Sequence, residues 1–121
     1  MTNKRVAAFG AMLSFAVLLT ACHSRQVDVT VENHTGAAIQ QLEVDYPSAS
    51  FGSNSLDANA EFKYRIQIRG NGAVMVQYSD SEGHTVKLTG STLAEAQEGR
   101  IAIVLLPEGK AEFHPELTPG S

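Results

Sequence analysis

The sequence predicts a small all-β protein, built as a β-sandwich or a small barrel, behind an N-terminal export signal. Apolar residues recur at every second position in several runs, and clusters of Asn, Asp and Gly separate these runs. Alternation of this kind is typical of half-buried strands, and such clusters are typical of turns. Only one short segment has the features of a helix, so the strands determine the fold class.

Residues 1–21 have the layout of an export signal. A short basic start with Lys4 and Arg5 precedes an uncharged stretch that ends in small residues. The uncharged stretch from Val6 to Ala21 has sixteen residues, fewer than the roughly 20 that a membrane-spanning helix needs. The segment is therefore expected to be cleaved and not to stay in the membrane as a span.

The end of this segment resembles the lipobox of bacterial lipoproteins, through Leu19, Thr20, Ala21 and Cys22. The resemblance implies signal recognition at the first three residues, cleavage before Cys22, a diacylglyceryl group on its thiol and an N-acyl chain on the new amino terminus. Two or three acyl chains hold a protein firmly on a bilayer, whereas one holds it only marginally. Ordinary cleavage that leaves a free thiol is the alternative. Because Cys22 is the only cysteine, no intramolecular disulfide is possible.

Removal of the signal leaves 100 of the 121 residues, enough for one domain. Lys4 and Arg5 leave with it while all thirteen acidic residues remain, so the formal net charge changes from −4 to −6. An acidic surface argues against nucleic acid as a partner and against close contact with anionic lipid. We expect Cys22 and a short linker at 22–26 and the folded domain at 27–114.

The strands are predicted from alternation along the domain. The runs at 26–32 and 41–46 place Val or Leu on one face and acidic or polar residues on the other, and the run at 61–69 alternates most clearly. Residues 73–79 and 85–89 follow the pattern less cleanly, whereas 101–106 is entirely apolar, as in a strand covered on both faces or one that crosses the core. Turn residues separate these runs at 33–36, 57–60, 70–72, 80–83 and 107–110.

Two segments near the end of the chain are predicted to lie outside the sheets. In residues 91–99, Thr92 and Glu95 fit a capping box and Gly99 fits a helix stop, but the segment is short for a stable helix. We expect a crossover loop with at most one or two helical turns there. The last residues, 115–121, contain two prolines and no apolar period, which predicts a flexible tail.

Residues 29–46 and 51–89 also resemble a group of small bacterial lipoproteins with an immunoglobulin-like β-sandwich. The shared pattern is the turn at 33–36, Phe51 and Gly52 before Leu56, and the hairpin at 80–83. The resemblance implies a single immunoglobulin-like antiparallel β-sandwich of about seven strands. It implies no activity.

No pattern in the sequence favours catalysis. His34 and His84 fall in or beside predicted turns, without the spacing of a metal-binding motif, and no serine lies in a nucleophile elbow. We therefore expect a protein that is not an enzyme and that has no metal or cofactor besides the lipid on Cys22. The alternatives are an envelope hydrolase or metal-handling protein that uses these turn histidines, and a purely structural component.

Two features are candidates for partner binding. Lys63, Arg65 and Arg69 project from one predicted strand face and suit an anionic glycan or phosphate, unless they pair with acidic residues of neighbouring strands. Phe51 lies in a long polar segment, 46–55, with the composition of a recognition loop, unless it closes one end of the sandwich.

The expected function is that of a lipid-anchored, non-catalytic binding or accessory module of the bacterial cell envelope. Its expected partners are the membrane, through the lipid, and an envelope protein. Residue 23 is His and not the Asp associated with inner-membrane retention in proteobacterial lipoproteins. This favours the outer membrane, facing the periplasm, where the host has one.

Overall fold

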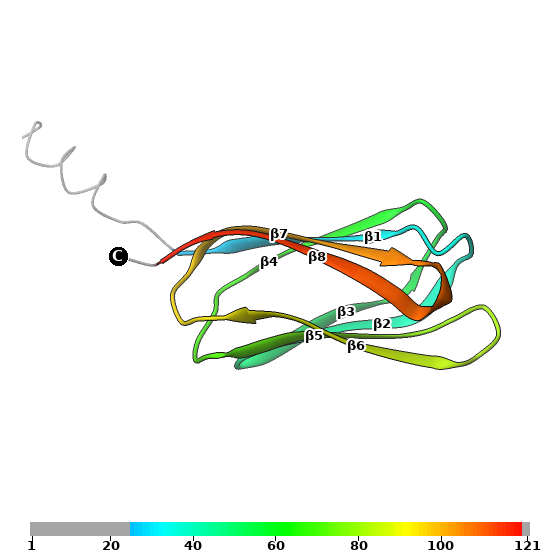
Figure 1. Ribbon diagram of the computed structural model, residues 1–121, viewed down its shortest axis with the longest axis horizontal. Helices are drawn as coiled ribbons and strands as arrows, with labels where there is room; N and C mark the ends of the chain where they lie inside the picture. The colour runs from blue at the N-terminus through cyan, green and yellow to red at the C-terminus, as the bar shows by residue number, and fades with distance from the viewer. Residues whose placement is uncertain (1–24, 120–121) are drawn as a thin grey trace, which may run out of the picture.

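The computed structural model describes residues 25–119, and these form two four-stranded sheets packed face to face (Figure 1). The predicted all-β sandwich is therefore confirmed. It has eight strands, where the sequence predicted about seven. The predicted signal segment 1–21 and Cys22 lie outside the described residues. Within residues 25–119, no helix is long and apolar enough to cross a membrane.

In the first sheet the order is β4 (Glu61–Ile66), β1 (Val27–Asn33), β7 (Glu98–Leu106) and β8 (Lys110–Thr118). In the second sheet it is β3 (Ala49–Leu56), β2 (Ile39–Tyr46), β5 (Gly72–Ser79) and β6 (Thr85–Leu93). Along the chain, β1 and β4 each enter the first sheet singly, whereas β2–β3 and β5–β6 are consecutive pairs in the second sheet and β7–β8 is a consecutive pair in the first. A single 3₁₀ turn, Pro107–Gly109, joins β7 to β8.

Strand β1 occupies the interior of its sheet although it is first in the chain. It pairs antiparallel with β4 and parallel with β7, so that Val29 lies opposite both Tyr64 and Ile101. The predicted sandwich was antiparallel throughout, and this one parallel pair is a difference from that expectation. The pair arises because the chain changes sheets after β6 and adds β7 on the open side of β1.

The core follows from the alternation in the sequence. Val27, Val29 and Val31 of β1 are at most 2% exposed, while Asp28 and Thr30 face outward. Ile101, Ile103 and Leu105 of β7 are equally buried, but Ala102, Val104 and Leu106 are only half-buried. The apolar run at 101–106 is thus a strand with one fully buried and one half-buried face, so the first of the two alternatives, a strand covered on both faces, is wrong.

A β-bulge in β2 explains two consecutive glutamines in the middle of a strand. Gln41 has a φ of 52°, and the pairing with β5 shifts its register between Gln40 and Glu43. The extra residue lets Ile39 and Leu42 both face the core although they are three positions apart. The sequence signal for this bulge is the break in strict alternation.

Three boundary predictions were wrong. The crossover loop expected at 91–99 is confined to 94–97, because β6 continues through the fully buried Leu93 and β7 begins at Glu98, and it contains no helical turn. The tail predicted to be flexible from residue 115 pairs with β7 through Thr118, and Pro115 is tolerated because β8 is an edge strand. The strand expected at 61–69 ends at Ile66.

Different parts of the chain lie at the two ends of the sandwich. At one end, here called the proximal end, β1 begins and β8 ends (Figure 1). The opposite end, here called the distal end, is formed by the turns at 34–38, 57–60, 80–84 and 107–109. The chain enters the domain at the proximal end, and the distal end is the part furthest from that entry.

Candidate binding site

A buried asparagine organises the distal end. Asn33, the last residue of β1, is fully buried, and its Nδ2 donates to the carbonyl oxygens of Ala37, Leu56 and Asp57 at 2.8–3.1 Å. Its Oδ1 accepts from the backbone N–H and the hydroxyl of Thr35. One amide side chain therefore fixes two turns, because both of its polar atoms are satisfied within the protein.

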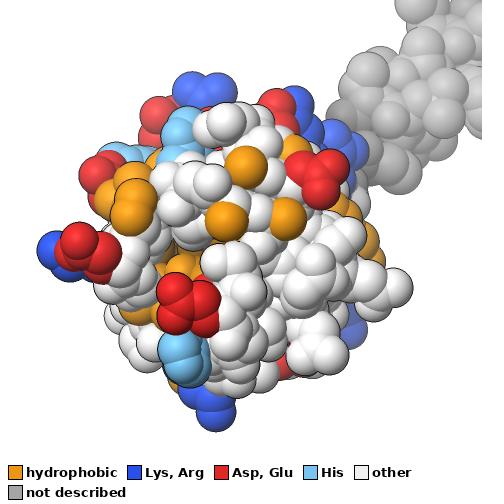
Figure 2. All heavy atoms as spheres, turned by 90° about the vertical axis from the view of Figure 1, so that its right-hand side faces the viewer, with side chains coloured by type: hydrophobic (Ala, Val, Ile, Leu, Met, Phe, Trp, Pro, Cys, Tyr) orange, Lys and Arg blue, Asp and Glu red, His pale blue; other side chains and the backbone are white. Residues whose placement is uncertain are grey.

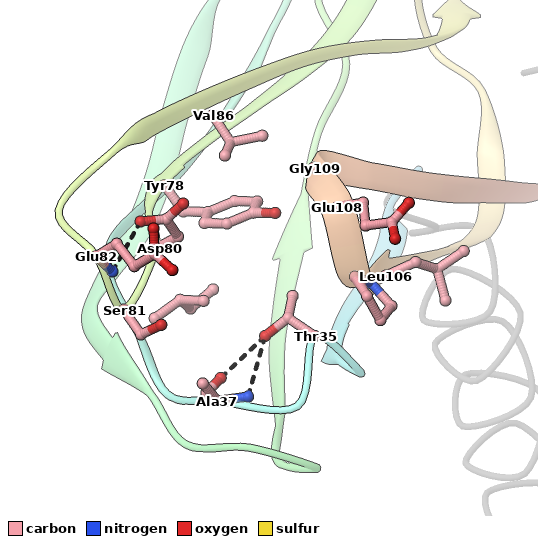
Figure 3. A pocket seen from close by; sticks show the side chains of 12 residues that line it. Thr35, Ala37, Tyr78, Asp80, Ser81, Glu82, Val86, Leu106, Glu108 and Gly109 are labelled. Atoms are coloured by element: carbon pink, nitrogen blue, oxygen red, sulfur yellow. Dashed lines mark hydrogen bonds between the residues drawn. The ribbon is translucent and has the colours of Figure 1, made fainter.

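A hollow of about 420 Å³ lies at this end, between the turn after β1, the β5–β6 hairpin and the β7–β8 turn (Figure 3). Figure 2 views the distal end, where acidic side chains stand around apolar surface. The lining is Thr35, Ala37, Ile39, Tyr78, Asp80, Ser81, Glu82, Val86, Leu106, Pro107, Glu108 and Gly109. It combines an apolar wall with three carboxylates, and it contains no Lys or Arg among the described residues.

Tyr78 reaches the hollow from inside the core. Its side chain extends from β5 toward the space below Gly109, and only 2% of the residue is exposed (Figure 3). Among the described residues, its hydroxyl has no hydrogen-bond partner. Burial of the phenol, and to a lesser extent the nearby charge of Asp80, raise its pKa. The hydroxyl therefore stays protonated at neutral pH and is free to bond a ligand.

The carboxylates on the rim come from two different turns. Asp80 Oδ1 accepts the backbone N–H groups of Glu82 and His84, both at 2.9 Å. The hydrogen bond from the His84 N–H is the main cause that lowers the pKa of Asp80, so this carboxyl stays ionised. Glu82 lies beside it, and Glu108 stands on the opposite side of the hollow (Figure 3).

The two turn histidines lie at the distal end, but neither lines the hollow. His34 Nε2 is 3.7 Å from Glu32 Oε1, and His84 Nδ1 is 3.6 Å from Asp80 Oδ2. In residues 25–119, no group of three or more His, Cys, Asp or Glu side chains is arranged to hold a metal ion. His34 thus lies beside one carboxylate of its own segment, and His84 lies beside two, since its Nδ1 is also 3.7 Å from Glu82 Oε2.

The structure places Phe51 in the core and not on a recognition loop. The segment from Ala49 to Leu56 is strand β3, and Phe51 is 7% exposed. Its ring stacks on Tyr64 with a centroid distance of 4.7 Å, and it also contacts Tyr46 and Phe62. Phe51 therefore links the neighbouring edge strands of the two sheets, and its assignment as a partner contact was wrong.

The three candidate cations do not form one free basic strip. Arg65 Nε bonds Asp28 Oδ1 across the β4–β1 pair at 2.8 Å, which is the pairing given above as the alternative. Lys63 Nζ lies 3.7 Å from Glu61 Oε1 of its own strand, and Arg69, beyond the end of β4, bonds Gln67. Acidic or polar neighbours thus engage each of these side chains.

Arg65 belongs to a row of charges that crosses the outer face of the first sheet. Asp28 lies beside Arg100 in the β1–β7 register, and Arg100 bonds Glu116 of β8 at 2.7–2.8 Å. The signs alternate from β4 to β8, so the face is internally compensated. Exposed pairs of this kind contribute little to stability.

Sequence reasoning missed the hollow itself. The turns at 33–36, 80–83 and 107–110 were predicted, but each was interpreted as a connection only. The sequence signal in the third turn was Pro107 followed two residues later by Gly109, which marks a tight turn, and in the structure Glu108 and Gly109 both have positive φ there. That three distant turns meet around Tyr78 depends on strand order, which alternation does not reveal.

Comparison with known proteins supports the fold alone. No protein-family model matches the chain, and no curated protein is significantly similar to it. Among solved structures, the chain is similar to the NMR structure of a protein from Eubacterium rectale, with a TM-score of 0.55 and 12% sequence identity. The similarity covers 80% of this chain and 91% of that one, and it supports a sandwich architecture.

Proposed function

We propose that this protein is a lipid-anchored, non-catalytic binding module of the bacterial cell envelope, which holds its ligand in the distal hollow. The observation that carries the proposal is the position of the hollow relative to the entry of the chain. The lipobox-like sequence ends at Cys22, five residues before β1 begins at Val27 at the proximal end. The hollow lies at the distal end.

The length of the domain and the shortness of its linker favour the distal end as the place where a partner binds. A nine-residue strand such as β7 spans roughly 30 Å. A linker of four residues between Cys22 and Val27 reaches at most about 14 Å. A protein held on so short a tether explores little space, so the distal end is the part best placed to meet a partner in front of the membrane.

The composition of the hollow favours binding over catalysis. Its hydroxyl groups come from Thr35, Tyr78 and Ser81, and no histidine lines it to serve as their base. The Thr35 hydroxyl is already engaged by Asn33 and Ala37. A preformed concave site with an apolar wall and a few polar groups is typical of ligand recognition.

The same proposal places the protein in the outer membrane, facing the periplasm, where the host has one. His23 at the position after Cys22 supports this location. The partner would be another envelope component within reach of the anchored domain. The acidic surface left after signal removal keeps the domain off anionic lipid.

The test is site-specific photocross-linking in intact cells. A photoreactive residue replaces Glu108 at the hollow, with Glu95 in the β6–β7 turn as the matched proximal position. Labelling with radioactive palmitate, in the wild type and in Cys22→Ser, checks the anchor. We expect palmitate on the wild type alone and a defined adduct from position 108 that is absent from position 95.

Two outcomes would contradict the proposal. If the wild type takes up no palmitate, the lipid anchor is wrong. If both positions give the same adducts, or if position 108 gives none, the hollow is not the site of capture.

A further inference from the structure

We propose that the distal hollow binds a primary ammonium group at the end of a short aliphatic chain, as in a lysine side chain or a polyamine. This inference rests on the binding role proposed above and adds the chemical class of the ligand. It is carried by the Tyr78 hydroxyl, the carboxylates on both sides of the hollow and the apolar wall between them.

The first argument is the unused hydrogen-bonding capacity of Tyr78. Only 2% of the residue is exposed, and Tyr78 belongs to the lining of the hollow. Its hydroxyl has no hydrogen-bond partner among residues 25–119. No buried polar side-chain atom of the described residues lacks a partner, so the Tyr78 hydroxyl is an atom that opens onto the hollow, where a ligand can bond it. Substitution by Phe would preserve the packing and remove this hydrogen-bonding group.

The second argument is charge. Asp80 and Glu82 lie on one side of the hollow and Glu108 on the other, while Lys and Arg are absent from the described lining (Figure 3). The backbone hydrogen bonds to Asp80 fix its carboxylate in place. Three carboxylates around one concave surface repel an anion and attract a cation.

The third argument distinguishes an ammonium from a metal ion. The carboxylates are separated by the hollow, and no group among the described residues is arranged for metal coordination. An ammonium has three N–H donors, which match carboxylates from both sides and the Tyr78 oxygen. It needs no tight coordination shell.

The fourth argument concerns the part of the ligand that is attached to the ammonium group. Ile39, Val86, Leu106 and Pro107 supply apolar surface next to the polar groups. Methylene groups bury well against such a wall while the charged head reaches the carboxylates. A bare ammonium ion would leave this surface unused, so a chain of several methylenes fits better.

The test is a two-dimensional NMR titration of the full-length processed protein in detergent micelles. The probes are n-butylammonium, 1-butanol and butyrate, which share one chain and differ in charge. We expect n-butylammonium to shift the amide signals of Tyr78, Glu82 and Gly109, with butanol weaker and butyrate inactive. High salt should weaken the ammonium response, because it screens the carboxylates.

Matched variants assign the response to the hollow. Tyr78→Phe should keep the fold and weaken n-butylammonium binding by about threefold, the value of one hydrogen bond. The double variant Glu82→Gln with Glu108→Gln should weaken it by about fivefold through lost charge. Glu95→Gln, which changes one charge at the proximal end, should leave the affinity unchanged.

A second titration separates the two sources of the group. Nα-acetyl-lysine N-methylamide represents a protein side chain, and spermidine represents a free polyamine. Tighter binding of the first supports a protein partner, whereas tighter binding of the second supports a soluble amine. Both outcomes are consistent with the inference.

The results that overturn the inference leave the binding role testable. If butanol or butyrate shifts the same amides as strongly as n-butylammonium, the ligand class is wrong while binding at the hollow stands. If none of the three probes acts, the ammonium inference fails, and the cross-linking experiment alone decides the proposed function. If Tyr78→Phe and the double Gln variant bind like the wild type, the response does not come from the hollow.

Discussion

The ring of Phe113 in β8 occupies the space where a side chain at Gly90 in β6 would lie. A Cβ atom at Gly90 would come 2.3 Å from Cδ2 and 2.7 Å from Cγ of Phe113. Because even Cγ is too close, a rotation of the ring alone does not relieve the clash. The contact joins the last strands of the two sheets and closes one side of the sandwich.

We therefore expect Gly90→Ala to destabilise the protein by about 1–3 kcal/mol through overpacking. Urea unfolding followed by circular dichroism measures this loss. In a Phe113→Ala background the same substitution should cost much less, because the ring is gone. Equal costs in both backgrounds would show that Gly90 is required for its backbone alone.

Asn33 is expected to be the polar residue whose loss harms the fold most. Asn33→Ala leaves the carbonyl groups of Ala37, Leu56 and Asp57 without their donor, which should cost about 3 kcal/mol. His34→Ala, in the same turn but exposed, should stay within about 0.5 kcal/mol of the wild type. Similar urea midpoints for the two variants would refute the role of Asn33 as the link between two turns.

Phe51→Ala should lower stability by about 3–5 kcal/mol, as expected for a buried aromatic residue. Tyr64→Ala should cost less, because Tyr64 is 48% exposed and has solvent on the face away from Phe51. Thermal or urea unfolding of both variants is the measurement. A Phe51→Ala protein as stable as the wild type would restore the surface role rejected above.

The lowered pKa of Asp80 predicts a pH-dependent contribution to stability. A carboxyl group with a depressed folded-state pKa stabilises the fold above its unfolded-state pKa, and this contribution is lost as the pH falls through the folded-state value. Asp80→Asn keeps an oxygen that can accept the two backbone N–H groups but removes the charge. We expect it to be less stable than the wild type at pH 7, with the difference shrinking at pH 2.

Urea unfolding at these two pH values is the measurement. A difference that stays constant between pH 2 and pH 7 would exclude the charge of Asp80 as its cause. Asp57→Asn serves as a control for a general effect of removing one negative charge at the distal end.

The Arg65–Asp28 pair should couple weakly. Both side chains are more than 60% exposed, and a double-mutant cycle with alanine should give a coupling free energy of about 0.2–1 kcal/mol. The value should fall in 1 M salt, where exposed charges are screened. A coupling that is zero at low salt would mean that Arg65 remains free for an anionic partner.

The parts of the fold that follow from local chemistry were predictable. Strict alternation placed Val27, Val29 and Val31 on the buried face, and Asn, Asp and Gly marked the turns. What the sequence did not reveal depends on contacts between distant segments. Pro115 argued against a strand, but its position on an edge strand makes it acceptable.

The site was less predictable than the fold, for the same reason. Phe51 is surrounded in sequence by Ser, Gly and Asn, so its neighbours gave no sign of burial, and only the β3–β4 contact encloses it. Tyr78 lies in the run 73–79, which was predicted only as a strand, and its open hydroxyl is visible only once the turns at 80–84 and 107–109 are placed. Pairing of Arg65 with Asp28 was foreseen as an alternative because a charged strand face commonly finds its opposite on the next strand.

The interior position of β1 in its sheet determines how the domain would carry a force applied through the proposed N-terminal lipid anchor. A pull on the residue before Val27 acts along the strand, against ladders to β4 on one side and β7 on the other. The force is then parallel to the strand, so the hydrogen bonds to β4 and β7 are loaded at the same time. In a strand pulled sideways from a sheet, by contrast, the hydrogen bonds break one after another. A pull through the proposed lipid anchor would therefore be resisted by the pairing of β1 with both of its neighbours.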